Sequence, residues 1–209
     1  MPFSIFNPSD QLSLDRKIAV GLERISQALK AVIWEEAKKS GLSPIQIQFL
    51  TILHFEKYTA WTIGELANRS SLTPATVSDA VTSLEQKGLV ARRKKGEDRR
   101  TVYLNLTDAG RKMARKLGGW ANVLQEATAG LPEQEKAVFL KSLMTVMLSL
   151  QGGGHLEPSH MCITCKYFRP NAHRNSRMPH HCATIDIAFG DSELRVDCPD
   201  YKANGVEGA

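Results

Sequence analysis

The stretch Thr62–Gly110 constrains the fold more than any other part of this 209-residue sequence. Thr62 and Glu65 have the capping-box spacing, at which each side chain hydrogen bonds a free backbone N–H in the first turn of a helix. A second helix start follows at Thr73, because the next residue is a proline, whose missing N–H would be unpaired anyway at the first helical position. The sequence therefore predicts two short helices in succession.

A hairpin is expected after the second helix, which should end near Lys87 because Gly88 offers the left-handed cap. The charged run ARRKKGEDRR then leads into apolar residues that alternate at Val102, Leu104 and Leu106, as in a strand. The sequence therefore predicts two strands joined at a charged tip.

Charge distinguishes this hairpin from ordinary surface. Between residues 87 and 116, eleven Lys or Arg oppose three acidic residues, a local balance of +8, while the whole chain is only +5. A basic stripe confined to one hairpin suits the neutralisation of phosphates, and a small polar helix before it suits insertion into a major groove. A charged tip that only faces water is the alternative. The order of the elements favours a surface that binds double-stranded DNA.

The same segment resembles the winged helix-turn-helix of the MarR family of bacterial transcriptional regulators. The resemblance lies in Leu66-Ala67, in the run LEQKGLV at 84–90, in the wing Asp98-Arg99-Arg100 and in the run LTDAG at 106–110. It implies that the second helix enters the major groove and that the wing reaches phosphates or the minor groove. The implied DNA-binding residues are Thr73, Ala75, Thr76, Ser78, Asp79, Thr82, Ser83, Lys94, Lys95, Arg99 and Arg100.

Long amphipathic helices are expected on both sides of this segment. Apolar residues recur at helical spacing over residues 14–37, and further helices should begin at Ser43, run from Thr107 to about Thr128, and run from Pro132 to Leu150. The last helix is apolar on more than one face, so it should pack against a partner chain. With the first helix it would form the homodimer interface that the resemblance also implies, and two recognition helices would address a near-palindromic operator.

The expected fold class is thus mainly α, a winged helix-turn-helix domain with long dimerisation helices. The expected parts are a dimerisation helix in 1–41, the DNA-binding domain in 42–110 and further dimerisation helices in 107–151. Four residues are candidates for a pocket that takes a small aromatic effector, although simple packing is favoured for them. These residues are Trp34, His54, Tyr58 and Trp61.

A different composition begins after the three glycines at 152–154, which predict a flexible break. All four cysteines and five of the six histidines lie beyond it, so 155–203 should form a small irregular module. Cys162 and Cys165 form a CxxC, and Cys182 and Cys198 follow after sixteen and fifteen further residues. Four cysteines in so short a stretch of a cytosolic protein indicate a metal or cluster rather than disulfides.

Three kinds of cysteine site compete. An iron-sulfur cluster, [4Fe-4S] by preference, is favoured because a single CxxC followed by two widely spaced cysteines, the last before proline, is similar to the spacing of high-potential iron-sulfur proteins. Zinc is the main alternative, although zinc ribbons usually supply two CxxC knuckles. A thioredoxin-like CxxC fits least, because no strand precedes it. His180 and His181 are backup ligands or hydrogen-bonding neighbours.

The function expected is therefore that of a DNA-binding regulator that senses redox state or iron-sulfur status. A regulator with structural zinc and an aromatic effector is the first alternative, and an electron carrier or redox enzyme fits less well. No nucleophile–base pair or nucleotide loop is evident, so no enzymatic activity is expected. No run of about 18 apolar residues and no export signal is apparent, so a cytoplasmic location without membrane contact is expected.

Overall fold

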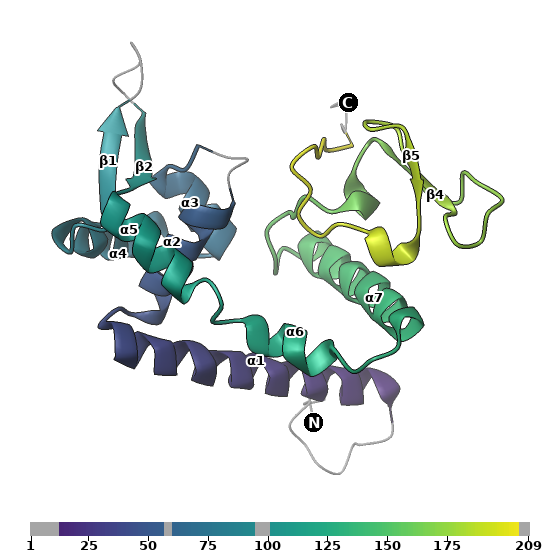
Figure 1. The fold of residues 1–209 in the computed structure, drawn as a ribbon, viewed down its shortest axis with the longest axis horizontal. Coiled ribbons are helices and arrows are strands. Elements are labelled where there is room, and N and C mark those ends of the chain that lie inside the picture. The colour runs from purple at the N-terminus through teal and green to yellow at the C-terminus, as the bar shows by residue number, and fades with distance from the viewer. Residues whose placement is uncertain (1–12, 57–59, 95–100, 205–209) are drawn as a thin grey trace. The chain divides into compact units, whose positions relative to one another are not determined.

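The computed structural model describes residues 13–56, 60–94 and 101–204. These residues belong to two compact units, one made of 1–66 with 73–125 and the other of 67–72 with 126–209. Each unit is described by itself. The chain is mainly helical, with a small sheet in each unit (Figure 1). Within the described ranges, no helix is both long and apolar enough to cross a membrane.

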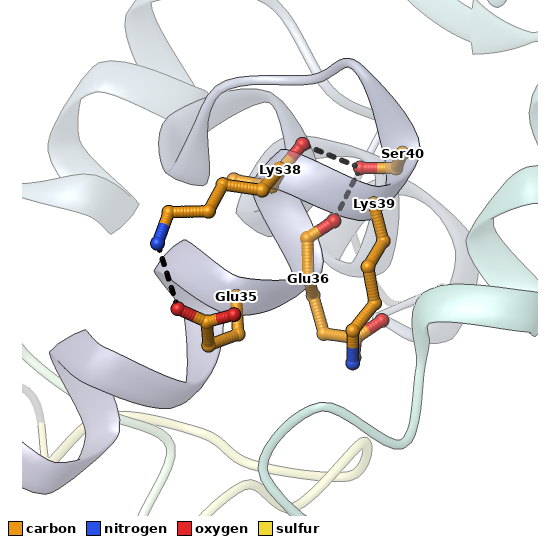
Figure 2. Close-up of polar contacts among 6 residues, drawn as sticks. Glu35, Glu36, Lys38, Lys39 and Ser40 are labelled. Carbon is orange, nitrogen blue, oxygen red and sulfur yellow. Dashed lines mark hydrogen bonds and ion pairs between the residues drawn. The ribbon is translucent and has the colours of Figure 1, made fainter.

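The first helix, α1 (Leu14–Ser40), begins at a serine cap and ends at a glycine in the left-handed conformation. The Ser13 hydroxyl accepts a hydrogen bond from the Arg16 N–H at 3.3 Å, and Gly41 follows the last turn with φ of 66°. Figure 2 shows the last two turns, where Glu35 lies beside Lys38 and the Ser40 hydroxyl donates back to the backbone. Lysines near the C-terminus favour the helix because they face the negative end of its dipole.

The next three helices follow the predicted capping signals. Helix α2 (Pro44–Phe55) has the full Ser43–Gln46 capping box. Helix α3 (Ile63–Ser70) begins at the reciprocal pair in which the Thr62 N–H donates to Glu65 at 2.7 Å and the Glu65 N–H donates to the Thr62 hydroxyl. In helix α4 (Pro74–Gln86) the Thr73 hydroxyl accepts from Thr76 N–H, and Gly88 has φ of 68°. These starts and the end at Gly88 confirm the prediction.

The hairpin consists of β1 (Val90–Lys94) and β2 (Val102–Leu106), which pair antiparallel with Val90 opposite Leu106. The loop before α3 extends this sheet at one point, because the Leu104 N–H donates to the Trp61 carbonyl at 2.7 Å. Helix α2 contacts α4, β2 and α5, so it lies in the core of this unit as expected. The buried core residues on these elements include Ile47, Phe49, Leu50, Val77, Val81, Leu84, Leu104, Leu106, Ala114 and Leu117.

The helix predicted from Thr107 to about Thr128 is two helices, α5 (Asp108–Leu117) and α6 (Asn122–Thr128). The prediction of one continuous helix was therefore wrong. The break falls at Gly118-Gly119, because consecutive glycines weaken a helix and a close neighbour requires the first of them. A Cβ on Gly118 would lie 2.5 Å from the Phe55 ring of α2.

The three glycines at 152–154 end α7 (Glu133–Gly152) rather than form a flexible break. Gly154 has φ of 71°, and the His155 N–H donates back to the Leu150 carbonyl at 2.9 Å, which is the bond pattern of a helix cap. The Gln151 side chain then donates to the Glu157 carbonyl at 3.1 Å and to the Ser159 hydroxyl at 3.2 Å. The expected flexibility is thus corrected, because the glycines provide a left-handed turn that the following loop reinforces.

The cysteine-containing segment packs on α7. It contains a three-stranded antiparallel sheet of β3 (Phe168–Arg169), β4 (His180–Cys182) and β5 (Ile187–Phe189), with 3-10 turns at Cys162–Thr164 and Asp191–Glu193. The segment lies beside α7 (Figure 1). Met144 of α7 is fully buried together with three residues of the segment. Those three residues are Met161, Phe189 and Leu194. The segment and α7 therefore share one hydrophobic core.

The junction between β1 and α5 generates a stability prediction. A Cβ on Gly110 would lie 1.9 Å from the backbone oxygen of Leu89, which also accepts from the Thr107 N–H at 3.1 Å. Gly110→Ala should therefore lower the free energy of unfolding by about 2–4 kcal/mol, more than the roughly 1 kcal/mol average for point substitutions. Thermal unfolding checks this.

The matched control is Gly64→Ala in α3, where the nearest atom to the added Cβ is 3.9 Å away. This change should be neutral or stabilise by up to about 1 kcal/mol, because alanine is the better helix former. Equal melting temperatures for the two variants would contradict the predicted backbone clash.

Candidate DNA-binding surface and cysteine site

The N-terminal half of α4 presents a small polar surface. Thr73, Ala75, Thr76 and Asp79 are exposed, and Ser78 is half-buried. The hydroxyls of Thr73 and Thr76 lie 2.9 Å apart, so the first turn is fixed by its own cap. Five of the predicted DNA-binding residues therefore lie together on one part of the helix.

The C-terminal half of α4 is used differently. The Thr82 hydroxyl accepts from the Arg92 guanidinium at 3.1 Å, and Arg92 also lies 3.4 Å from the Glu85 carboxylate. The Ser83 hydroxyl, half-buried, accepts from the Gln46 side-chain amide at 2.9 Å. These contacts link Thr82 to β1 and Ser83 to α2, so both side chains also position the helix.

Gln46 positions helix α4 through contacts that the sequence did not predict. Its exposed fraction is 6%, and its side-chain oxygen accepts from Ser43 N–H at 3.1 Å and from the Lys87 ammonium at 3.2 Å. Its amide nitrogen meets Ser83, so one side chain joins the start of α2 to the end of α4. The capping-box spacing identified Gln46 as a helix start, and no sequence signal pointed to its bonds with a helix 37 residues away.

The wing is described only in part. Lys94 is exposed at the end of β1, with Arg93 exposed beside it. Lys95, Arg99 and Arg100 lie outside the described residues, so their roles stay predictions.

A pocket of about 610 Å³ lies between α2, the loop before α3 and the hairpin. His54 and Trp61 line it, as do Arg93, Tyr103 and Arg111. Two of the four pocket residues suggested by the sequence are thus brought together. Trp34 is 57% exposed and is not among the lining residues, and Tyr58 lies outside the described residues.

Backbone bonds bring the last cysteine back to the first two. The Cys198 N–H donates to the His160 carbonyl at 2.9 Å, and the Lys166 N–H donates to the Lys202 carbonyl at 2.9 Å. Cys165 also forms an antiparallel β-bridge with Ala203. Backbone hydrogen bonds therefore hold the CxxC turn against residues 195–203 at several points. Cys182 comes from β4, where it pairs with Phe168 and Ile187.

Cys162, Cys182 and Cys198 line one cavity of about 80 Å³, and Cys165 lies on the turn that carries Cys162. The volume is several times the roughly 10–15 Å³ that one water requires, so a group of several atoms fits. The apolar lining residues are Ile185, Ile187 and Phe189. In the part of the chain that is described, no group of three or more His, Cys, Asp or Glu side chains is arranged so that it could hold a metal ion.

The cysteine site disfavours unpaired thiolate charge. Burial raises the pKa of the Cys162 thiol, and the nearby Cys198 and Cys165 raise this pKa further, while hydrogen bonding from the Arg195 N–H lowers it. Several thiolates in such a site repel one another unless a cation compensates their charge. Metal ions that bind thiolates supply that compensation.

His180 is a structural residue rather than a backup ligand, because both ring nitrogens are engaged. Its exposed fraction is 3%, Nδ1 accepts from the Asn171 N–H at 3.3 Å, and Nε2 lies 2.7 Å from the Asp191 carboxylate. The bond at Nδ1 assigns the proton to Nε2. Asp191 also lies 3.2 Å from the ammonium of Lys141, so the sheet is linked to α7. His181 lies 3.3 Å from His173 and 3.4 Å from Asp186.

Comparisons with known proteins agree with this geometry. The family model described as MarR family matches residues 42–102, which include α2, α3, α4 and β1. The HTH-type transcriptional repressor MdtR of Bacillus subtilis (strain 168) is 32% identical over 128 residues, which cover 61% of this chain and 80% of that protein.

Two solved structures have the same fold over about two thirds of the chain. A MarR family transcriptional regulator from Silicibacter pomeroyi is 26% identical, with a TM-score of 0.57, and the match covers 68% of this chain and 93% of that one. The MepR–DNA complex of S. aureus is 23% identical, with a TM-score of 0.56, and the match covers 64% of this chain and 98% of that one. The family model ends well before Cys162, so it leaves the cysteine site untouched.

The Asp191 contacts generate a pH prediction. Hydrogen bonding from His180, and then the Lys141 ammonium, hold the pKa of Asp191 below its ordinary 3.8. A lowered folded pKa contributes stability that is fully present above the unfolded value and is lost as pH falls through the folded value. Asp191→Asn should therefore lower the free energy of unfolding by about 1 kcal/mol at neutral pH, the low end for a charged hydrogen bond, because the carboxylate is partly exposed.

Thermal unfolding of both proteins at neutral pH and below pH 3.8 checks this. The difference in melting temperature should shrink in acid, because the wild-type carboxylate then becomes protonated. A difference that is the same at both pH values would assign the effect to lost packing instead.

Proposed function

The chain belongs to the MarR family of DNA-binding transcriptional regulators, and we propose that it is a homodimeric cytoplasmic regulator whose DNA binding responds to an iron-sulfur cluster. Cys162, Cys165, Cys182 and Cys198 would hold the cluster, [4Fe-4S] by preference. The observation that carries the proposal is that three of these cysteines line one and the same cavity, with apolar residues around it. The relatives of this chain are transcriptional regulators rather than enzymes, which agrees with the absence of enzymatic activity expected from the sequence.

DNA reading is assigned to the exposed part of α4 and to the wing. Thr73, Ala75, Thr76 and Asp79 are exposed at the start of the helix, and exposed Lys94 begins the wing. Small polar side chains at a helix start can approach base edges, whereas lysines and arginines neutralise phosphates. The MepR–DNA complex, which has this fold, supports the assignment to DNA.

A homodimer is supported by apolar side chains that each unit leaves exposed on its long helix. On α1 these are Leu14, Ile18 and Ile25. On α7 they are Val138, Phe139, Val146, Leu148 and Leu150. Exposed apolar stripes of this kind mark protein–protein interfaces. Two copies related by a two-fold axis would address half-sites about 34 Å apart in a near-palindromic operator.

The shared core supports a mechanism that couples the cysteine site to the dimer. Cys162 and Cys182 pack against the cluster of buried residues that contains Met144 of α7. A bound iron-sulfur cluster would anchor the loops that carry the cysteines, and without it the residues that cover Met144 would be held less firmly. The packing of α7 in the proposed dimer would then change, and with it the spacing of the two recognition helices.

A second candidate function keeps the DNA reader and changes the signal. The pocket of about 610 Å³ has aromatic and basic lining residues, His54, Trp61, Arg93, Tyr103 and Arg111. Such a lining suits a small aromatic effector with a negative charge. In this alternative the four cysteines hold a structural zinc ion.

The wing generates a prediction about DNA affinity. Arg99→Ala or Arg100→Ala should weaken binding to all sequences and reduce the slope of log K against log salt by about 0.9 for each lost phosphate contact. Thr76→Val should instead alter which sequences are preferred, at about 1–3 kcal/mol for a base contact. Fluorescence titrations at several salt concentrations measure both effects.

The matched control is Lys39→Ala, which removes the same charge from the end of α1, where Lys39 pairs with Glu36 at 2.8 Å. Its salt slope should equal that of the wild type. Arginine variants with the wild-type affinity and slope would show that the wing assignment is wrong.

The cysteine site generates a prediction about colour and metal content. Protein prepared without oxygen should be brown, because thiolate and sulfide transfer charge to iron, and it should bleach in air. Each cysteine changed to serine should lose iron, whereas His181→Ala should keep it. DNA binding should change on bleaching, and the serine variants should behave as the bleached protein does.

Iron, sulfide and zinc analysis with an absorption spectrum distinguishes the two functions. A zinc site is colourless and has no redox chemistry of its own. About one zinc for each chain, with iron at background level in protein made anaerobically with iron supplied, would overturn the cluster and favour the effector-binding alternative.

A further inference from the structure

We infer that Arg195 sets the charge balance, and thereby the reduction potential, of the cysteine site. The inference rests on the proposed function, because it concerns the cluster that the four cysteines would hold. It assigns Arg195 the role of a positioning and tuning residue, not of a ligand.

The backbone of Arg195 is paired with Cys162 in both directions. The Arg195 N–H donates to Cys162 Sγ at 3.2 Å, and the Cys162 N–H donates to the Arg195 carbonyl at 2.9 Å. The sulfur is thus held by a hydrogen bond that survives any change of the Arg195 side chain, except to proline. Hydrogen bonds to ligand sulfurs are among the features that set cluster potentials.

The side chain of Arg195 faces a second cysteine. Its Nη1 lies 3.7 Å from Cys198 Sγ and 4.0 Å from Asp200 Oδ2. Contact with Cys198 also raises the pKa of the guanidinium above its ordinary value. One residue therefore meets the cysteine site at two sulfurs, Cys162 through its backbone and Cys198 through its charge.

The positive charge of Arg195 matters because of the other residues that line the cavity. Its charged lining residues are Glu193, Arg195 and Asp200, so Arg195 is the single cation among the described residues that line it. A guanidinium stays charged at all relevant pH values. A cation beside a ligand sulfur favours the cluster state with more negative charge, which is the reduced state. Arg195 should therefore raise the reduction potential, and Asp200, beside the guanidinium, should lower it.

The experiment compares the iron-loaded full-length wild type with four variants, prepared without oxygen. Iron and sulfide content is measured first, and the potential is then measured by a spectroscopic redox titration. Arg195→Gln should shift the potential to more negative values, Arg195→Lys should shift it less, and Asp200→Asn should shift it to more positive values. Arg177→Gln removes the same charge from an exposed residue of the segment outside the cavity lining, so it should leave the potential at the wild-type value.

The outcomes separate the inference from the proposed function. A wild type without iron and sulfide would overturn both. An iron-loaded wild type whose potential is unchanged in Arg195→Gln, or is shifted equally by Arg177→Gln, overturns the inference alone. If Arg195→Gln does not load iron, Asp200→Asn and Arg195→Lys decide. A more positive reduction potential in Asp200→Asn together with a slightly more negative one in Arg195→Lys supports the inference. Any other pair of results overturns it.

Discussion

The burial of Met144 against Met161, Phe189 and Leu194 is the contact on which the cysteine-containing segment depends. The sheet of this segment has strands of two and three residues, and most of its surface faces water. Such a segment buries too little apolar surface to fold alone, so it requires a metal, a cluster or a neighbouring element. Helix α7 supplies the neighbouring element, and the proposed cluster at the four cysteines would add a second support.

In the unit that contains the helix-turn-helix, the buried side-chain amide of Gln46 positions helix α4. Gln46 caps α2 and also reaches Ser83 and Lys87 at the end of α4. A buried polar side chain of this kind is stable only because its bonding groups are satisfied, and each bond restricts the angle between the two helices. The start of α4 stays exposed, where the proposed contacts with DNA lie, while the far end of the helix is held by the fold.

The parts of the fold that depend on local chemistry could be predicted from the sequence. The pairs Thr62–Glu65 and Ser43–Gln46 identified helix starts because capping acts over three residues, and Thr73 before proline acted likewise. Gly88 identified a helix end because few other residues adopt a positive φ. The apolar spacing of α4 gave its buried face for the same local reason. The prediction that the four cysteines form one metal or cluster site stays a prediction, although three of them line one cavity.

What depended on distant neighbours could not be predicted. The break before α6 requires the Phe55 ring beside Gly118, and the three glycines at 152–154 read equally well as a linker or as a cap. The excess apolar surface of α7 was ascribed to a partner chain, whereas Met144 is covered by residues of the same chain. The hydrogen bonds of His180 and Arg195 depend on how the chain folds around them, and no local sequence pattern predicts these contacts.

The double use of α7 has a consequence in mass action. One face of the helix is buried under the cysteine-containing segment, and the apolar residues that remain exposed are those proposed for a partner chain. Two equilibria that order the same helix are linked, so in the proposed homodimer the association of two chains would stabilise the folded segment, and the folded segment would strengthen the association. If the four cysteines hold the proposed cluster, the iron concentration at which half of the sites are filled would fall as the concentration of the protein rises.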